Sequence, residues 1–163
     1  MNTAYLLIGG NVGNRKNNLQ KAIQLINESC AEIIEQSSIY QTAAWGVTDQ
    51  PDFFNQVLVL QTALQPQQLL TQLLLIEEKM GRIRTIKMGP RTIDIDILLM
   101  NDLIINSPSL TLPHPALPQR KFALIPLNEV APTLIHPVEK KTITALLQLC
   151  TDTLNVQKIS ANA

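Results

Sequence analysis

The sequence has no excess of charge of either sign and few aromatic residues or cysteines. Its 163 residues carry 13 Lys and Arg against 13 Asp and Glu, so the formal net charge at pH 7 is zero. A neutral chain with three Phe and two Tyr lacks the basic surface and stacking aromatics typical of RNA-binding modules, which argues against a nucleic-acid partner. Cys30 and Cys150 are too few and too far apart for a disulfide framework or a metal motif, so we expect two reduced thiols.

Long hydrophobic runs and a signal peptide are missing as well. No apolar stretch approaches the roughly 20 residues of a membrane span, and residues 1–10 are uncharged and unlike a signal peptide. We therefore expect a cytoplasmic protein with no membrane partner. With 45% hydrophobic and 16% charged residues, the chain is long enough to build a sizeable core as a single domain over residues 1–163.

The most informative stretch is residues 92–100, where polar and apolar residues alternate before the run becomes wholly apolar. This period of two predicts a β-strand whose far end is buried inside a sheet. Successive side chains of a strand point to opposite faces, so Asp94 and Asp96 share one face. Carboxylates about 7 Å apart repel each other, and a divalent cation with oxygen ligands relieves that repulsion. For this pattern alone, a solvated strand face with two aspartates is the alternative.

Basic residues crowd the segment just before this strand, although the whole chain is neutral. They are Lys79, Arg82, Arg84, Lys87 and Arg91. Arginines bind phosphate oxygens well, while metal ions would bind the carboxylates. Together the two features are typical of a phosphoryl-transfer site.

The hydrophobic pattern predicts the order strand, helix, strand, strand, helix, strand. We expect the strands near residues 4–8, 33–42, 53–62 and 92–100, and the helices across 19–26 and 66–80. The glycines after the first strand are predicted to begin a loop, which lacks the spacing and the lysine of a P-loop. This βαββαβ series predicts an α+β fold with a ferredoxin-like core, an antiparallel sheet with helices on one face.

The C-terminal part of the chain is dominated by proline. Seven of the ten prolines lie between positions 108 and 137, so we expect a Pro-rich extension that is poor in regular elements. His114 stands between two prolines that hold it in place; a turn residue without chemistry is the alternative. Residues 103–105 are expected to form a short hairpin with the preceding strand, a final helix should begin at Thr142, and the tail beyond Asn155 should be loosely held.

Several segments recur together in the order of one known family. The most specific is Gly89-Pro90-Arg91-Thr92-Ile93-Asp94-Ile95-Asp96. The others are Gly9-Gly10-Asn11, Ser37-Ser38-Ile39-Tyr40-Gln41-Thr42, Asp49-Gln50-Pro51-Asp52-Phe53-Phe54-Asn55, Ile76-Glu77, Gly81-Arg82, and Pro113-His114-Pro115 with Arg120 and Phe122. This set resembles the 6-hydroxymethyl-7,8-dihydropterin pyrophosphokinases of folate synthesis. Members commonly carry arginine and an aromatic residue where this chain has Lys87-Met88, a departure that leaves the aspartates untouched.

The resemblance implies an enzyme that moves the β,γ-pyrophosphoryl group of ATP, its co-substrate, to the pterin hydroxymethyl oxygen and leaves AMP. Asp94 and Asp96 would be the metal ligands and hold two Mg²⁺ ions. The resemblance further implies a catalytic set, namely Arg82, Arg91, Asp94, Asp96 and Arg120. It implies an ATP-binding set, namely Glu77, Arg82, Arg84, Arg91, Ile97, Thr111, His114 and Arg120. It implies a pterin-binding set, namely Thr42, Ala43, Trp45, Phe53, Asn55 and Phe122. We expect a monomer whose partners are these two small molecules.

Two rival interpretations remain open at the level of sequence. Another metal-dependent transfer, such as nucleotidyl transfer, also uses paired aspartates on a strand and would release pyrophosphate instead of leaving AMP. A ferredoxin-like RNA-binding or ligand-sensing module without catalysis would need exposed aromatic residues on its strands and a basic face.

Overall fold

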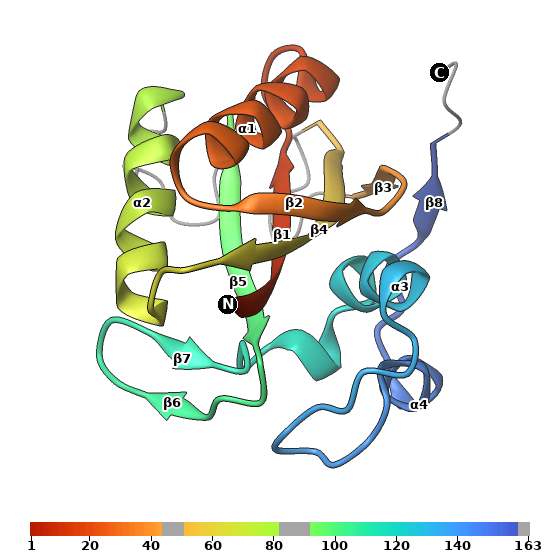
Figure 1. Ribbon diagram of the computed structural model, residues 1–163. Helices are drawn as coiled ribbons and strands as arrows, with labels where there is room; N and C mark the ends of the chain where they lie inside the picture. Colours follow the sequence, from red (N-terminus) through yellow and green to blue (C-terminus); the bar gives the residue numbers. More distant parts are fainter. Residues whose placement is uncertain (44–50, 82–91, 160–163) are drawn as a thin grey trace.

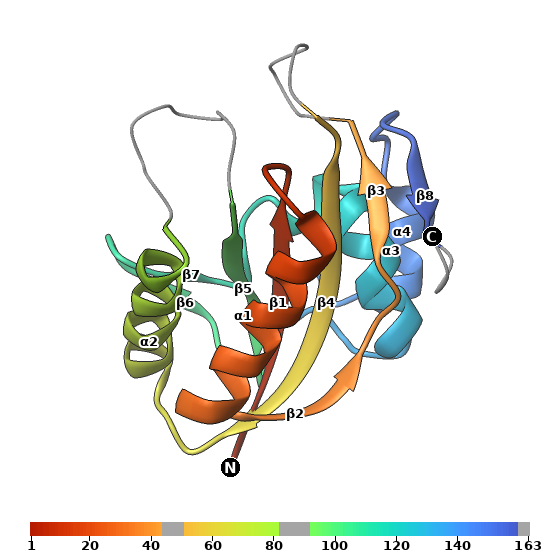
Figure 2. The same ribbon diagram turned by 90° about the horizontal axis from the view of Figure 1, so that it is seen from above.

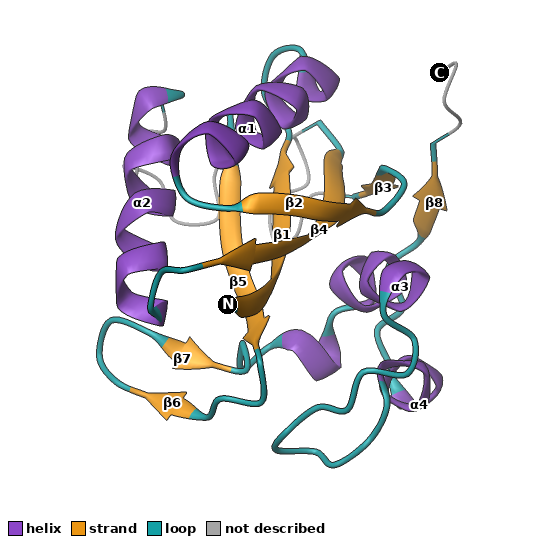
Figure 3. Cartoon of the chain, viewed as in Figure 1, coloured by secondary structure: helices purple, strands orange, loops and turns teal. Residues whose placement is uncertain are grey.

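The computed structural model of the protein describes residues 1–43, 51–81 and 92–159 (Figures 1 and 3). In chain order its elements are β1 (Asn2–Gly10), α1 (Arg15–Ser29), β2 (Glu32–Gln36), β3 (Tyr40–Thr42), β4 (Phe53–Thr62), α2 (Pro66–Lys79), β5 (Asp94–Met100), β6 (Ile105–Asn106), β7 (Thr111–Leu112), a 3₁₀ turn η1 (Leu117–Gln119), α3 (Lys121–Val130), α4 (Ile143–Leu149) and β8 (Val156–Lys158).

The main sheet is antiparallel throughout and has the strand order β5-β1-β4-β3-β8, with β2 also paired to β4. The short strands β6 and β7 pair with each other in a second, two-stranded sheet. The first part of the chain follows the predicted order of strand, helix, strands, helix and strand, with three strands between the helices where two were expected. The expected α+β fold with an antiparallel sheet is therefore confirmed.

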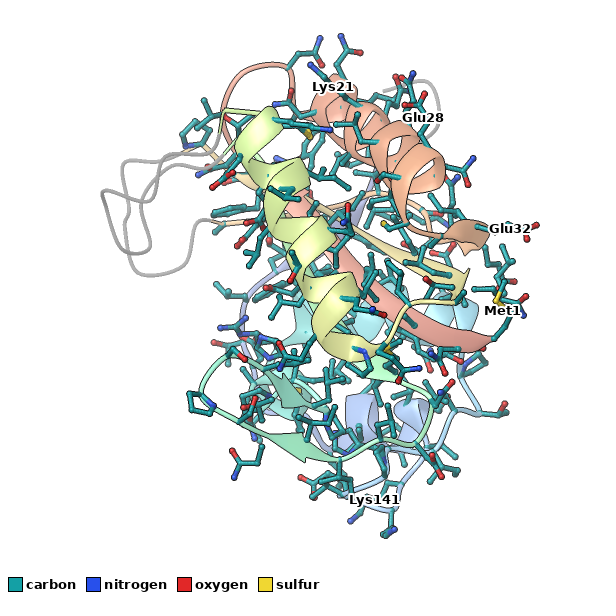
Figure 4. All side chains as sticks on the ribbon, turned by 60° about the vertical axis from the view of Figure 1, so that its left-hand side comes forward. Met1, Lys21, Glu28, Glu32 and Lys141 are labelled. Carbon is teal, nitrogen blue, oxygen red and sulfur yellow. The ribbon has the colours of Figure 1, made fainter. Side chains whose placement is uncertain are left out.

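One face of the sheet is covered by α1 and α2, which the sequence predicted from their apolar stripes. Buried residues of β1 on this face, Ala4, Leu6 and Ile8, join the inward side chains of both helices in one core cluster. The outward side of α1 is polar, and Figure 4 shows its exposed Lys21 and Glu28. Both helices start at capped ends. The Asn14 side chain accepts from Asn17 N at 3.1 Å, and Gln65 and Gln68 form a capping box before α2.

The opposite face is covered by α3 and α4, so helices lie on both sides of the sheet (Figure 2). A second core cluster joins Leu7 and Val57 of the sheet to Leu124 and Leu127 of α3 and Leu146 of α4. The prediction of helices on one face alone therefore described only the first half of the fold.

The proline-rich segment is not poor in regular structure, which corrects that prediction. Helix α3 lies within it and contains Pro126. Proline lacks an N–H, so the helix loses one internal hydrogen bond at this position. Ala123, Leu124 and Leu127 nevertheless bury a continuous apolar face against the sheet. Burial of that face outweighs the lost hydrogen bond.

Three further predictions about individual strands were also wrong. The strand expected at 33–42 is split into β2 and β3 by Ser37, Ser38 and Ile39, which belong to no strand. The first strand extends through Gly10 instead of ending before Gly9. The segment after β5 pairs with β7 and not with β5.

The tail beyond Asn155 is also not loosely held as far as the described residues reach. Its β8 is the edge strand of the main sheet and pairs with β3. Among the described residues, no helix combines the length and the apolarity needed to cross a bilayer.

Candidate active site

One row of residues crosses the main sheet in register. Asp94 of β5 lies opposite Gly9 of β1, Gly9 opposite Asn55 of β4, and Asn55 opposite Tyr40 of β3. Residues directly opposite each other in antiparallel strands point to the same face of the sheet. The carboxylate of Asp94 and the amide of Asn55 are therefore on the same face, separated only by a glycine.

The next row identifies that face. Asp96 lies opposite Leu7, and Leu7 lies opposite Val57. Both apolar residues belong to the core cluster beneath α3 and α4. Asp94 and Asp96, which are half-buried, therefore lie on the α3 side of the sheet, where the apolar packing gives way to polar residues. The predicted sharing of one face by the two aspartates agrees with this register.

Gly9 leaves the space that Asn55 occupies. A Cβ atom built on Gly9 would overlap Asn55 Oδ1 and would lie 3.0 Å from Phe54 O. Any larger residue would therefore displace the amide. The sequence contained this glycine in a matching segment, but only the strand register shows what it accommodates.

Asn55 and Thr42 form a buried polar pair beside Phe53. Their side chains are 5% and 3% exposed, and Asn55 Nδ2 donates to Thr42 Oγ1 at 3.4 Å, a long hydrogen bond. Phe53 lies opposite Thr42 and is half-buried, while Ala43 is exposed just beyond β3. A buried amide edge next to an aromatic side chain suits a flat heterocycle with donors and acceptors along one edge.

His114 and Arg120 approach the aspartates from the segment between β7 and α3. His114 N donates to Leu98 O at 2.8 Å, which ties this segment to β5. Burial lowers the pKa of His114, the positive charge of Arg120 lowers it further, and the negative charge of Asp94 opposes both. These electrostatic interactions bring His114, Arg120 and Asp94 into one neighbourhood. The Arg120 guanidinium also lies 5.5 Å from the centre of the half-buried Phe122 ring.

The donor set suits a small, hard cation. Within the described parts of the chain, no group of three or more His, Cys, Asp and Glu side chains could hold a metal ion by itself. Asp94 and Asp96 supply carboxylate oxygens alone. Mg²⁺ is commonly held by one or two carboxylates, with substrate phosphates and water completing its octahedron. The two aspartates therefore fit Mg²⁺ brought in with a phosphate-bearing substrate.

Comparison with known proteins identifies the family. A sequence model described as 7,8-dihydro-6-hydroxymethylpterin-pyrophosphokinase (HPPK) matches residues 5–132. The chain belongs to the HPPK family. It is 43% identical over 143 residues to the 2-amino-4-hydroxy-6-hydroxymethyldihydropteridine pyrophosphokinase of Aquifex aeolicus, a match covering 88% of this chain and 89% of that protein. The Synechocystis enzyme of the same name is 42% identical over 146 residues, covering 89% of this chain and 74% of the relative.

Solved structures agree on the fold. The wild-type HPPK-DHPS of Plasmodium falciparum with SDX-DHP superposes with a TM-score of 0.73 at 19% sequence identity. The match covers 91% of this chain but 43% of the longer Plasmodium chain. At this identity the likeness concerns the fold, which is the HPPK fold.

The remaining expected ATP-binding residues of this HPPK chain that the structure describes, Glu77, Thr111 and Ile97, lie in three separate places. Glu77 of α2 is 2% exposed, and its Oε2 accepts a 2.7 Å hydrogen bond from Ile95 N, between the two aspartates. Thr111 is half-buried in the small β6–β7 sheet. Ile97 is 5% exposed in the core cluster beneath α1 and α2. Since it points to the face opposite Asp94 and Asp96, the structure does not bring it together with them.

Four expected site residues, Trp45, Arg82, Arg84 and Arg91, lie outside the described residues. The sequence assigned no site role to Arg15, which the structure places beside the start of β4. Arg15 Nη1 donates to Asp52 O at 2.7 Å, and its guanidinium lies 4.0 Å from the centre of the Phe54 ring. Asn11 Nδ2 similarly donates to Pro51 O at 3.1 Å. Hence the loop after β1 and the first residue of α1 anchor the chain just before β4.

Proposed function

We propose that this HPPK chain transfers pyrophosphate from ATP to 6-hydroxymethyl-7,8-dihydropterin in folate synthesis, giving AMP and the pterin diphosphate. Membership of the family supports the reaction. The observation that carries the assignment of residues is the row across the sheet. Carboxylates for a metal–phosphate complex lie on one side of Gly9, and a buried amide for a heterocycle lies on the other.

The reaction joins the pterin hydroxymethyl oxygen to the β-phosphorus of ATP. The bond between that phosphorus and the α,β-bridging oxygen breaks, and its electron pair stays on the α-phosphate of AMP. The hydroxyl proton is released to solvent. The chain must hold the two substrates so that the attacking and leaving oxygens are in line, because positioning and electrostatics supply most of the acceleration in phosphoryl transfer.

We assign the phosphate side of the site to Asp94, Asp96, His114 and Arg120. The two aspartates would hold two Mg²⁺ ions, which when bound would offset phosphate charge and align the oxygens. The planar guanidinium fork of Arg120 matches phosphate oxygens. Burial favours a neutral His114, which would serve as a hydrogen-bonding partner and not as a second cation.

We assign the pterin side to Asn55, Thr42, Phe53 and Phe122. Asn55 offers both a donor and an acceptor to the ring edge, and its burial makes a mismatched edge costly. Half-buried Phe53 and Phe122 provide flat apolar surfaces for the ring faces. Exposed Ala43 would lie at the rim.

We also propose a ferredoxin-like core, supported by the strand order β5-β1-β4-β3 with α1 and α2 on one face. The cytoplasmic location is a proposal supported by the two free cysteines, Cys30 and Cys150. The absence of a nucleic-acid partner and the monomeric state stay predictions from the sequence.

One incubation tests the reaction. The full chain is mixed with ATP, Mg²⁺ and the reduced pterin alcohol, and nucleotides and pterins are separated over time, with a pterin-free mixture as the control. We expect pterin-dependent AMP in equal amount to the pterin diphosphate. ADP in place of AMP would mean transfer of a single phosphoryl group, and released pyrophosphate would mean nucleotidyl transfer. No turnover, with salt-sensitive retention of RNA, would replace the enzyme by a binding module.

A further inference from the structure

Helix α3 is capped by a residue from the end of the chain. Asp152 Oδ2 accepts a 3.1 Å hydrogen bond from Lys121 N, 31 positions earlier, and Asp152 Oδ1 accepts from Leu154 N at 3.0 Å. Arg120 occupies the N-cap position but makes no side-chain cap hydrogen bond. A carboxylate at this place satisfies one of the free N–H groups of the first turn and interacts favourably with the helix dipole. Asp152 therefore does what the N-cap side chain does not.

The capped N–H lies between two residues of the proposed site. Lys121 N belongs to the peptide bond that follows Arg120, and Phe122 is the next residue along. Arg120 has an extended backbone, with φ −122° and ψ 100°, so the direction of the chain changes here as the helix begins. A hydrogen bond to this peptide fixes the point from which both side chains extend.

The segment that carries Asp152 is itself anchored to the pterin side of the sheet. Strand β8 lies beside β3 (Figure 2) and pairs with it. Lys158 is opposite Tyr40, and Val156 is opposite Thr42. Glu129, near the other end of α3, accepts hydrogen bonds from Tyr40 Oη at 2.5 Å and from Ser38 N at 2.9 Å. Helix α3, β3 and the C-terminal segment are therefore linked to one another pairwise: α3 to β3 through Glu129, β3 to β8 by strand pairing, and the C-terminal segment to α3 through Asp152.

We propose that Asp152 is a positioning residue for the transfer reaction. By holding the first turn of α3 it places Arg120 toward the phosphates and Phe122 against the pterin. Asp152 lies beyond residues 5–132, the part of the chain that the HPPK family model matches. The inference rests on the proposed function, through the roles given there to Arg120 and Phe122.

Three variants test this role in the full chain: Asp152→Ala, Asp152→Asn and, as a matched control, Thr142→Ala. Thr142 Oγ1 caps α4 by accepting from Ala145 N at 3.1 Å, and α4 carries none of the proposed site residues. Loss of either cap should lower Tm by about 3 °C. Initial rates of AMP formation are measured well below Tm, with ATP and pterin varied separately.

Asp152→Ala should lower kcat by about tenfold or more, since displacing a reacting group by ~1 Å can cost on the order of 100-fold. The KM for ATP should stay within about twofold of wild type, and the KM for the pterin should rise through Phe122. Asp152→Asn should recover most of kcat, because its Oδ1 can still accept from Lys121 N. Thr142→Ala should keep wild-type kcat. In an Arg120→Ala background, Asp152→Ala should lower kcat little further, because both changes remove the same placed guanidinium, while the rise in the pterin KM should persist.

Several results would contradict the positioning role of Asp152. Wild-type kcat in Asp152→Ala, a loss no larger than that of Thr142→Ala, or losses that simply multiply with Arg120→Ala would each overturn the positioning role while leaving the proposed function in place. A wild-type chain that forms no AMP would overturn the proposed function and this inference together. If Asp152→Ala does not fold, Asp152→Asn and Asp152→Ser, which differ in reach, are compared in its place, and equal kcat in the two would overturn the proposal.

Discussion

Gly9 has no side chain at the point where β1 passes between a carboxylate and an amide. The neighbouring strands place Asp94 and Asn55 on either side of it in register. Because a Cβ atom there would overlap Asn55 Oδ1, the requirement at position 9 is for space and not for backbone freedom. The site therefore depends on a residue that contributes no chemical group.

Gly9→Ala should consequently weaken pterin binding more than nucleotide binding. The added methyl group must push the Asn55 amide aside or strain the strand, which costs about 1–3 kcal/mol in a well-packed site. Calorimetric titration with each ligand checks this, and the Asn55→Ala background serves as control because the overlapped amide is absent there. Equal loss of both ligands would show that position 9 supports the sheet and not the pterin subsite.

For single residues, the sequence predicts side-chain placement where this depends only on neighbouring positions in the chain. The alternation around Asp94 and Asp96 already predicted that they share a face, because side-chain direction in a strand has a fixed period. Glu77 is different. Its place near the end of α2 was predictable, but its hydrogen bond to Ile95 N depends on how α2 lies along the edge of β5.

At the scale of elements, α3 is tied to β3 by one carboxylate, that of Glu129. Burial alone would raise the pKa of Glu129, but hydrogen bonds from Tyr40 and Ser38, and the charge of Lys158, lower it overall. Burial first, and then the Glu129 carboxylate, raise the pKa of the Tyr40 hydroxyl. Both directions describe one stable pair, a carboxylate that accepts and a phenol that donates.

Tyr40→Phe should lower the free energy of unfolding by about 2 kcal/mol, because one hydrogen bond to a carboxylate is lost while Ser38 still satisfies Glu129. Glu129→Gln should cost a similar amount, since the weakened acceptor also faces the Ser38 donors. Urea unfolding of both single variants and the double variant checks this. The double should cost less than the sum of the singles. Additive losses would mean that the two residues stabilise the fold separately.

Elements with a clear signal in their own sequence were predictable. Elements that are stabilised mainly by contacts with distant segments were not. Helix α2 has a proline at its start and an apolar stripe, so its range was nearly correct. Helix α3 was missed because Pro126 disfavours a helix in the local sequence. The helix is stabilised by packing its apolar face on the sheet, whose strands come from distant parts of the chain. Strand β8 was missed because a three-residue segment, half exposed, has no strand signal without β3 beside it.

At the scale of the whole molecule, one buried histidine links stability to pH. His136 is 4% exposed, and its Nδ1 accepts from Val138 N at 3.2 Å and Glu139 N at 3.0 Å. Burial lowers the pKa of His136 and the charge of Glu139 partly opposes this. The unfolded chain therefore binds more protons than the folded one below about pH 6.5. The stability contributed by neutral His136 is full above that pH and is lost as the pH falls through the folded pKa.

His136→Asn should flatten this dependence. The Asn Oδ1 can accept the same backbone N–H groups and does not titrate, so stability should fall less steeply between about pH 7 and pH 5. His114, the other of the two histidines, is present in both proteins, and the difference between their curves isolates His136. Thermal unfolding in a pH series checks this. A variant as pH-sensitive as the wild type would assign the dependence to other groups.

In the proposed function, transfer depends on metal ions held by Asp94 and Asp96, the two aspartates of β5. The most direct measurement is the rate of pterin-dependent AMP formation against Mg²⁺ concentration for wild type, Asp94→Asn and Asp96→Asn. Unfolding is followed alongside, and removing one of two repelling charges should leave the fold intact. Each variant should lose turnover by orders of magnitude and require more Mg²⁺. Near-normal turnover of either variant at limiting Mg²⁺ would contradict the claim.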